Sequence, residues 1–158
     1  MRFQKAQWLF PIAVTLHNAE EAIWMPSWTA RHASQVPIHP PGAIEIRIAL
    51  VVLTVAAFAL TYFSAHKGPQ SFWAYLLFGS IVAMLANVFV PHVPTTLMFR
   101  SYTPGVVTAV AINLPLMSYL AVRAVREGWV SGWKAVAFGA GVPLALGGAI
   151  VLWLARQV

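Results

Sequence analysis

Apolar residues fill long uninterrupted stretches of this chain. A helix needs ~20 mostly apolar residues to cross a lipid bilayer. The segments that meet this length are Ala6–Met25, Gly42–Ala65, Ser71–Val90, Thr103–Val122 and Gly132–Leu154. The pattern therefore predicts an all-α integral membrane bundle of about five transmembrane helices.

The segment after the first predicted helix, PSWTARHASQVPIHPP, is rich in proline. Proline has no backbone N–H, and its ring clashes with the preceding helical turn. We therefore expect the first helix to end at Met25, just before Pro26, and the segment to form an ordered loop or a short interfacial turn.

Composition agrees with a membrane location. The 158 residues are 59% hydrophobic and 9% charged, whereas roughly a quarter of the residues in soluble domains are charged. No polar stretch is long enough to fold outside the bilayer, so residues 1–158 are expected to form one domain. The formal charge of +6 is spread singly over helix ends, a distribution that argues against nucleic acid as a partner. The Lys and Arg positions favour an inside N-terminus and an outside C-terminus.

The stretch LHNAEEAIW places unusual chemistry in the first helix. Two of the chain's 4 acidic residues, Glu20 and Glu21, are adjacent there. On a helix they share a face with His17, while Asn18 lies to the side. A charge inside the bilayer costs a few kcal/mol, so this face must look into the bundle or a wet cavity.

Helix rise places other polar residues at a similar depth. Glu21 and His17 lie ~6 Å and ~12 Å below Met25. The residues that reach the same half of the membrane from other helices are Glu45, Arg47, Asn87, His92 and Asn113. We expect a site in the outer, extracytoplasmic half of a multi-pass protein. The alternative is a polar network that only holds the helices together.

The HNAEE stretch resembles the defining motif of the HXXEE family of small multi-pass membrane proteins, matched by His17, Glu20 and Glu21. The resemblance implies which residues matter, not which reaction they perform. The predicted architecture, with an intramembrane His and Glu at i, i+4, is also similar to the emopamil-binding class of sterol isomerases. That likeness implies acid-base chemistry by analogy alone.

The favoured hypothesis is acid-base catalysis without a cofactor on a hydrophobic, isoprenoid-like or lipid-like substrate. Two adjacent carboxylates in a low-dielectric site cannot both ionise cheaply, so one serves as acid and the other as base. His17 would shuttle the proton, and Arg47 would hold the ionised carboxylate. The ring of Trp24, Phe89 or Trp28 would stabilise a developing cation. Isomerisation, cyclisation or epoxide opening would use these parts.

Two alternatives remain open. In the first, His17, Glu21 and His92 bind zinc or iron and Glu20 acts as general base, giving an intramembrane hydrolase or oxidative enzyme. In the second, Glu20 and Glu21 titrate in a proton-coupled carrier or binding protein.

The last predicted helix has a stripe of small residues at every fourth position. These are Ala137, Gly141, Ala145 and Ala149. Small residues allow another helix to approach closely. The stripe predicts a helix contact within the chain or in a homo-oligomer.

Overall fold

The computed structural model describes residues 1–32 and 42–155, and these residues are almost wholly helical. The helical segments, with η marking π-helical turns, are α1 (Phe3–Ala6), α2 (Leu9–His32), α3 (Ala43–Lys67), α4 (Phe72–Asn87), η2 (Val88–His92), α5 (Val93–Phe99), α6 (Val106–Thr108), η3 (Ala109–Asn113), α7 (Leu114–Arg126) and α8 (Gly132–Ala155).

These segments join into five long rods in the described part of the chain. α4, η2 and α5 form one bent rod, and α6, η3 and α7 form another, beside α2, α3 and α8. The stretches long and apolar enough to cross a membrane are Ala43–Lys67, Phe72–Phe99, Val106–Arg126 and Gly132–Ile150. α2 is long enough as well, since its 24 residues rise ~36 Å, but it contains the polar stretch. The predicted all-α membrane bundle is confirmed.

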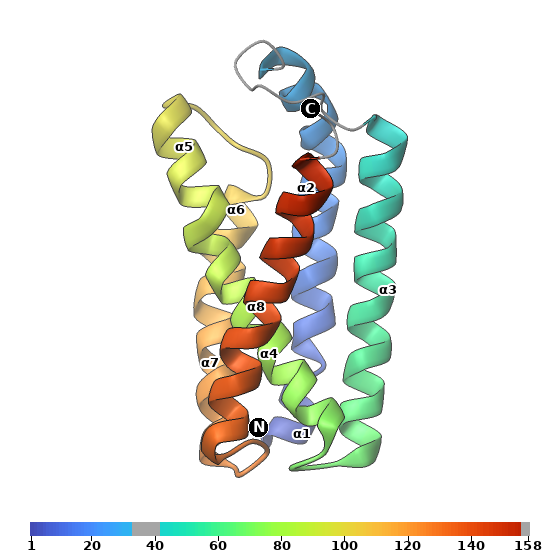
Figure 1. The fold of residues 1–158 in the computed structure, drawn as a ribbon, viewed down its shortest axis with the longest axis vertical. Coiled ribbons are helices and arrows are strands. Elements are labelled where there is room, and N and C mark those ends of the chain that lie inside the picture. Colours follow the sequence, from blue (N-terminus) through green and yellow to red (C-terminus); the bar gives the residue numbers. More distant parts are fainter. Residues whose placement is uncertain (33–41, 156–158) are drawn as a thin grey trace.

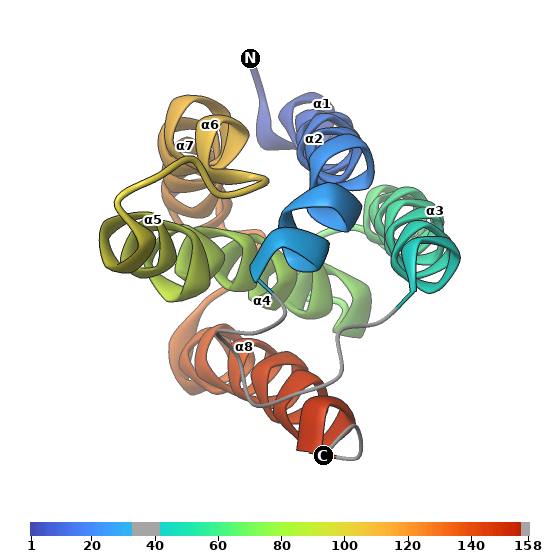
Figure 2. The ribbon, with the colours of Figure 1, turned by 90° about the horizontal axis from the view of Figure 1, so that it is seen from above.

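α4 lies at the centre of the bundle. Seen from above, α8 packs on one side of α4, while α2, α3 and the α6–α7 rod lie on the other (Figure 2). α1 and the end of α8 lie at opposite ends of the bundle (Figure 1). That arrangement is expected of an odd number of crossings, while the inside or outside location of each end stays a prediction.

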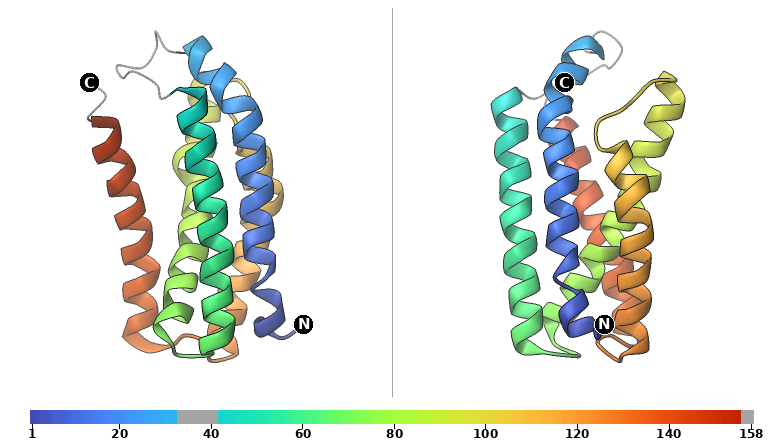
Figure 3. Two further views of the ribbon diagram at one scale, coloured as in Figure 1. Left: turned by 90° about the vertical axis from the view of Figure 1, so that its right-hand side faces the viewer. Right: turned by 180° about the vertical axis from the view of Figure 1, so that it is seen from behind.

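The surface of the bundle is apolar where lipid would contact it. Large hydrophobic side chains point outward along α3 and α8, among them Ile44, Val55 and Leu144. Such continuous apolar surface marks an interaction with membrane in a protein of this size. α8 also diverges from the other rods toward its C-terminal end (Figure 3). The chain is a multi-pass membrane protein.

In the part of the chain that the structure describes, the small-residue stripe on α8 lies on the surface. Ala137, Gly141, Ala145 and Ala149 are all exposed. α8 instead packs on α4 through Phe138 and Val142, which lie against Gly79. The stripe is therefore free to face lipid, and a homo-oligomer through it stays a prediction.

The expected end of the first helix at Met25 is wrong, because α2 continues through Pro26 to His32. Proline leaves the carbonyl four residues earlier, that of Ala22, without its helical partner. Arg47 Nε on α3 donates a hydrogen bond of 3.3 Å to this same oxygen. The helix continues because a neighbouring helix supplies the missing donor. The other three prolines of this segment, at 37, 40 and 41, lie outside the described residues.

Two other rods are longer than expected and are interrupted. The third extends past the predicted end at Val90 to Phe99, with a break in which Val90 has φ −149° and ψ 111°. The fourth begins at Val106 rather than Thr103 and contains the π-helical turn η3. π-helical turns are frequent at functional sites. Both interruptions lie beside the polar residues described below.

The contact between α4 and α8 yields a stability prediction. A Cβ added at Gly79 would lie 2.5 Å from Val142 Cγ2 and 2.6 Å from the Phe138 carbonyl oxygen. Gly79→Ala should therefore push the helices apart and lower the unfolding free energy by about 1–3 kcal/mol, as overpacking does. Thermal unfolding in detergent measures the change.

Gly147→Ala is the matched control, because nothing lies within 4 Å of a Cβ at that helical position. It should be neutral or slightly stabilising, since alanine favours helix. Equal melting temperatures for the two variants would contradict the tight packing of α8 on α4.

Candidate functional site

Two histidines and one carboxylate converge inside the bundle. His17 and Glu21 come from α2, and His92 comes from the break in the third rod. Glu21 Oε1 lies 3.7 Å from His17 Nε2 and 3.6 Å from His92 Nε2. Both imidazole rings are buried, with their centroids 4.8 Å apart and edge to face. We call His17, Glu21 and His92 the polar triad.

Asn87 joins the two rings from α4. Its Nδ2 lies 3.3 Å from His17 Nε2 and 3.0 Å from His92 Nε2. An amide nitrogen only donates, so in this arrangement both Nε2 atoms accept and neither bears a hydrogen. Each Nε2 lone pair therefore faces the Asn87 amide, and the Glu21 carboxylate oxygen lies 3.6–3.7 Å from both nitrogens.

The opposite side of the His17 ring is held by Thr108. The Thr108 hydroxyl donates to Glu20 Oε2 at 2.6 Å, and its oxygen lies 2.9 Å from His17 Nδ1. Because the single hydroxyl hydrogen goes to the carboxylate, the Thr108 oxygen accepts from the His17 Nδ1–H. This chain of hydrogen bonds assigns the tautomer that leaves Nε2 free.

Glu20 caps the start of the fourth rod. Its carboxylate accepts from the backbone N–H groups of Val107 and Thr108, at 3.3 and 2.8 Å, as well as from the Thr108 hydroxyl. The Tyr102 hydroxyl donates to it at 2.7 Å. Partial burial, and then the bond to Glu20, raise the pKa of Tyr102. Tyr102 thus stays protonated, and the Glu20 carboxylate lies at a helix N-terminus, where negative charge is favourable.

Gly105 closes the polar triad from the loop side. A Cβ at Gly105 would lie 2.5 Å from His92 Cε1 and 2.9 Å from His17 Cε1. Its φ of +85° is also in the left-handed region, which favours glycine. Glycine is needed here both for the turn and for the close approach of the backbone to the rings.

The break in the third rod directs His92 inward. Val90 leaves the helical conformation just before Pro91, and α5 starts directly after His92. His92 Nε2 accepts from Asn87, and the Thr103 hydroxyl donates to the His92 backbone carbonyl at 3.4 Å.

Three of the residues expected at the site bond elsewhere. Asn18 donates to the Leu50 carbonyl and the Thr54 hydroxyl on α3, so it holds two helices together. Glu45 accepts from the Gly42 N–H at the start of α3. Arg47 bonds the Ala22 carbonyl, as described above, and the ion pairs of the described residues include none between it and Glu20 or Glu21.

Asn113 and Trp24 occupy different surroundings. Asn113 is fully buried at the end of η3, and both polar atoms of its side chain lack a hydrogen-bond partner among the described residues. Trp24 lines a pocket together with Glu20 and Tyr102.

Sequence reasoning missed Thr108, Gly105 and Tyr102. The dipeptide Pro104-Gly105 is a recognisable turn signal, and it could have suggested a close approach of the backbone. No pattern in the sequence distinguished Thr108 or Tyr102 from other residues near helix ends.

The chain belongs to the HXXEE family. The family described as "Protein of unknown function with HXXEE motif" matches residues 8–120. The uncharacterized protein YrkK of Bacillus subtilis (strain 168) is 30% identical over 110 residues, which are 69% of this chain and 68% of that protein. No solved structure matches. The polar triad and its supporting residues lie inside the matched range, whereas α8 lies outside it.

Replacement of Gly105 tests how closely the backbone approaches the triad. Gly105→Ala should lower the unfolding free energy by more than Gly128→Ala. Both glycines have positive φ, +85° and +69°, and each alanine loses about 1–2 kcal/mol for that conformation. Only the first also meets the histidine rings, since nothing lies within 4 Å of a Cβ at Gly128. Equal losses in thermal unfolding would contradict this geometry.

The unpartnered amide of Asn113 gives a second prediction. An unsatisfied buried polar group costs about 1–3 kcal/mol, and leucine has nearly the same shape without polar atoms. Asn113→Leu should therefore raise the unfolding free energy by about 1 kcal/mol, measured by denaturation in detergent. A clear loss of stability would show instead that the amide is hydrogen-bonded in the protein.

Proposed function

We propose that this protein is an intramembrane metal-dependent hydrolase in which His17, Glu21 and His92 bind one divalent transition-metal ion, zinc in the first instance. The single observation behind the proposal is the convergence of two unprotonated Nε2 atoms and one carboxylate oxygen. Its substrate is lipid-like and reaches the site from the bilayer.

The spacing of the polar triad supports a metal. Ligands at ~2.0–2.1 Å from a tetrahedral zinc are ~3.4 Å apart. The carboxylate oxygen lies 3.6 and 3.7 Å from the two nitrogens, and the three ligand atoms can all lie within 4.8 Å of one another. Two of the three separations are thus within a few tenths of an ångström of the zinc spacing, and a fourth position would remain for water.

The hydrogen bonds around the triad support the same proposal. Metal-binding histidines usually donate their second ring N–H to a carboxylate, carbonyl or water, which fixes the ring. His17 donates to Thr108, which is bound in turn to Glu20. Glu20 is therefore assigned a positioning role rather than that of a general base.

Charge balance favours the ion in an apolar setting. A zinc ion with the Glu21 carboxylate and one hydroxide has no net charge, which limits the cost of placing the site in a membrane. An ion held by His17, Glu21 and His92 would supply a hydroxide nucleophile for hydrolysis and would polarise the bond to be cleaved.

The cofactor-free alternative has less support. Its two carboxylates should share a proton, but Glu20 bonds to the 102–108 segment while Glu21 faces the histidines. The triad geometry is also compatible with the cofactor-free alternative. One proton shared between the Glu21 carboxylate and the two imidazole rings would satisfy the same three acceptor atoms. A metal measurement separates these two readings.

We predict that the protein purified in detergent contains about one zinc or iron per chain. His17→Ala should lose the ion, because one of three protein ligands is gone. Thr108→Val should keep the fold but weaken metal affinity by about 10–100-fold, the effect typical of second-sphere partners. Elemental analysis and competition with a chelator measure both.

His66→Ala is the control, since His66 is exposed and stacks on Tyr62 away from the triad. It should retain the metal content of the unmodified protein. A folded protein that binds no transition metal when zinc or iron is supplied would sink this proposal and favour a proton at the triad.

A further inference from the structure

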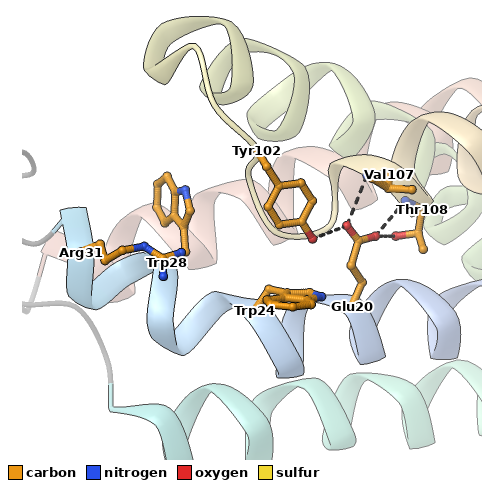
Figure 4. A pocket seen from close by; sticks show the side chains of 7 residues that line it. All are labelled: Glu20, Trp24, Trp28, Arg31, Tyr102, Val107 and Thr108. Atoms are coloured by element: carbon orange, nitrogen blue, oxygen red, sulfur yellow. Dashed lines mark hydrogen bonds between the residues drawn. The ribbon is translucent and has the colours of Figure 1, made fainter.

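A pocket of about 550 Å³ lies between α2 and the segment that precedes the fourth rod (Figure 4). On α2 it is lined by Glu20, Trp24, Trp28 and Arg31, which share one helix face at intervals of three or four residues. The segment from Tyr102 to Thr108 forms the other side. Because Thr108 contacts both the pocket and His17, one hydroxyl group separates the pocket from the triad.

The inner end of the pocket suits a cation. The rings of Trp24 and Tyr102 lie there edge to face, with centroids 6.4 Å apart, and the Glu20 carboxylate lies beside them (Figure 4). Four hydrogen bonds fix that carboxylate without removing its charge. Aromatic faces and a fixed anion together are the groups that recognise ammonium ions.

The outer end of the pocket suits an anion. The indole Nε1 of Trp28 is buried and has no hydrogen-bond partner among the described residues. Arg31, one turn further along α2, also lines the pocket. Indole and guanidinium groups only donate hydrogen bonds, and guanidinium pairs well with phosphate. An oxyanion would pair with the Arg31 guanidinium at this end, and a rotation of the Trp28 ring would bring its buried N–H to the same group.

We propose that the pocket binds the zwitterionic headgroup of a membrane lipid, in which a phosphate and an ammonium are joined by a short linker. The ammonium lies against Trp24, Tyr102 and Glu20. The phosphate lies toward Trp28 Nε1 and Arg31. The binding site stands on the pocket itself, whereas the further step, that such a lipid is the substrate class, rests on the proposed metal-dependent hydrolase.

The arrangement also defines how far apart the two charges of the ligand lie. Glu20 and Trp28 are eight residues apart on α2, a rise of ~12 Å, and the indole and tyrosine side chains cover part of that distance. A compact zwitterion such as a free amino acid is too short to reach both ends. A phosphate joined through an ethylene linker to an ammonium matches instead the single turn from Trp24 to Trp28, a rise of ~6 Å, with the glycerol lying beyond the phosphate.

Titration of soluble headgroups into the detergent-purified protein tests the proposal, with calorimetry as the readout. Glycerophosphocholine should bind more tightly than either choline, which has only the cation, or glycerol 3-phosphate, which has only the anion. Equal binding of either fragment would overturn the two-ended assignment. The absence of saturable binding by all three would overturn the site.

A short-chain lipid distinguishes a membrane lipid from a free solute. Dihexanoyl phosphatidylcholine, below its micellar concentration, should bind about tenfold or more tighter than glycerophosphocholine, because its acyl chains bury apolar surface. Equal affinities would overturn the lipid assignment and point to a soluble zwitterion.

Variants separate the two ends of the pocket. Trp24→Leu should abolish choline binding and retain that of glycerol 3-phosphate, while Arg31→Gln should do the reverse. Trp28→Phe keeps a ring but loses the N–H, so it should weaken only the phosphate-containing ligands. Trp133→Leu is the control, since Trp133 is 75% exposed and does not line the pocket. Loss of both fragments in every variant would show that the pocket does not recognise them separately.

The titrations are performed on metal-free and metal-loaded protein. Headgroup binding to a protein that takes up no metal would support this inference while the proposed hydrolase fails. Metal binding without headgroup binding would give the opposite result. The two proposals can therefore fail independently.

Discussion

Burial of hydrogen-bonding groups in an apolar bundle is the constraint on which this structure depends, and His17 shows how it is met. Thr108 accepts from one ring nitrogen, and Asn87 donates to the other. Thr108 is itself bound to Glu20, which caps the rod that begins with α6. Removal of the Glu20 carboxylate would therefore leave the first backbone N–H groups of that rod without an acceptor. It would also release the Thr108 hydroxyl that orients the His17 ring. One glutamate of the motif supports the site, while the other, Glu21, enters it.

Helix interruptions place these groups inside the bundle. A regular helix satisfies its own backbone, so each irregular turn needs a partner from elsewhere. At Pro26 the partner of the freed Ala22 carbonyl is Arg47. Near Pro91 the break brings His92 toward Asn87. Pro26 and Pro91 do not end their rods, and Arg47 bonds a backbone carbonyl rather than a carboxylate. These residues belong to the framework in which α2 and the third rod continue.

The polar triad and the neighbouring pocket form one continuous arrangement on α2. Glu21 faces the histidines and Glu20 faces the pocket, so adjacent residues serve adjacent sites. Such a division suits an enzyme that anchors the head of an amphiphile beside a metal. The family match covers every residue of the triad. The proposed chemistry therefore concerns the part of the chain that the family shares.

The sequence by itself determined the helical membrane bundle, because runs of apolar residues of bilayer length have few other solutions. It also singled out His17, Glu20 and Glu21 on α2, and Asn87 and His92 as polar residues of another rod, and Asn87 and His92 do contact His17 and Glu21. Only the tertiary structure decided which groups each polar side chain contacts. The separation of Glu20 from Glu21, the use of Arg47 as a donor to Ala22, and the approach of Gly105 all depend on contacts between rods far apart in sequence. Side-chain direction and helix breaks set those contacts, and neither follows from periodicity alone.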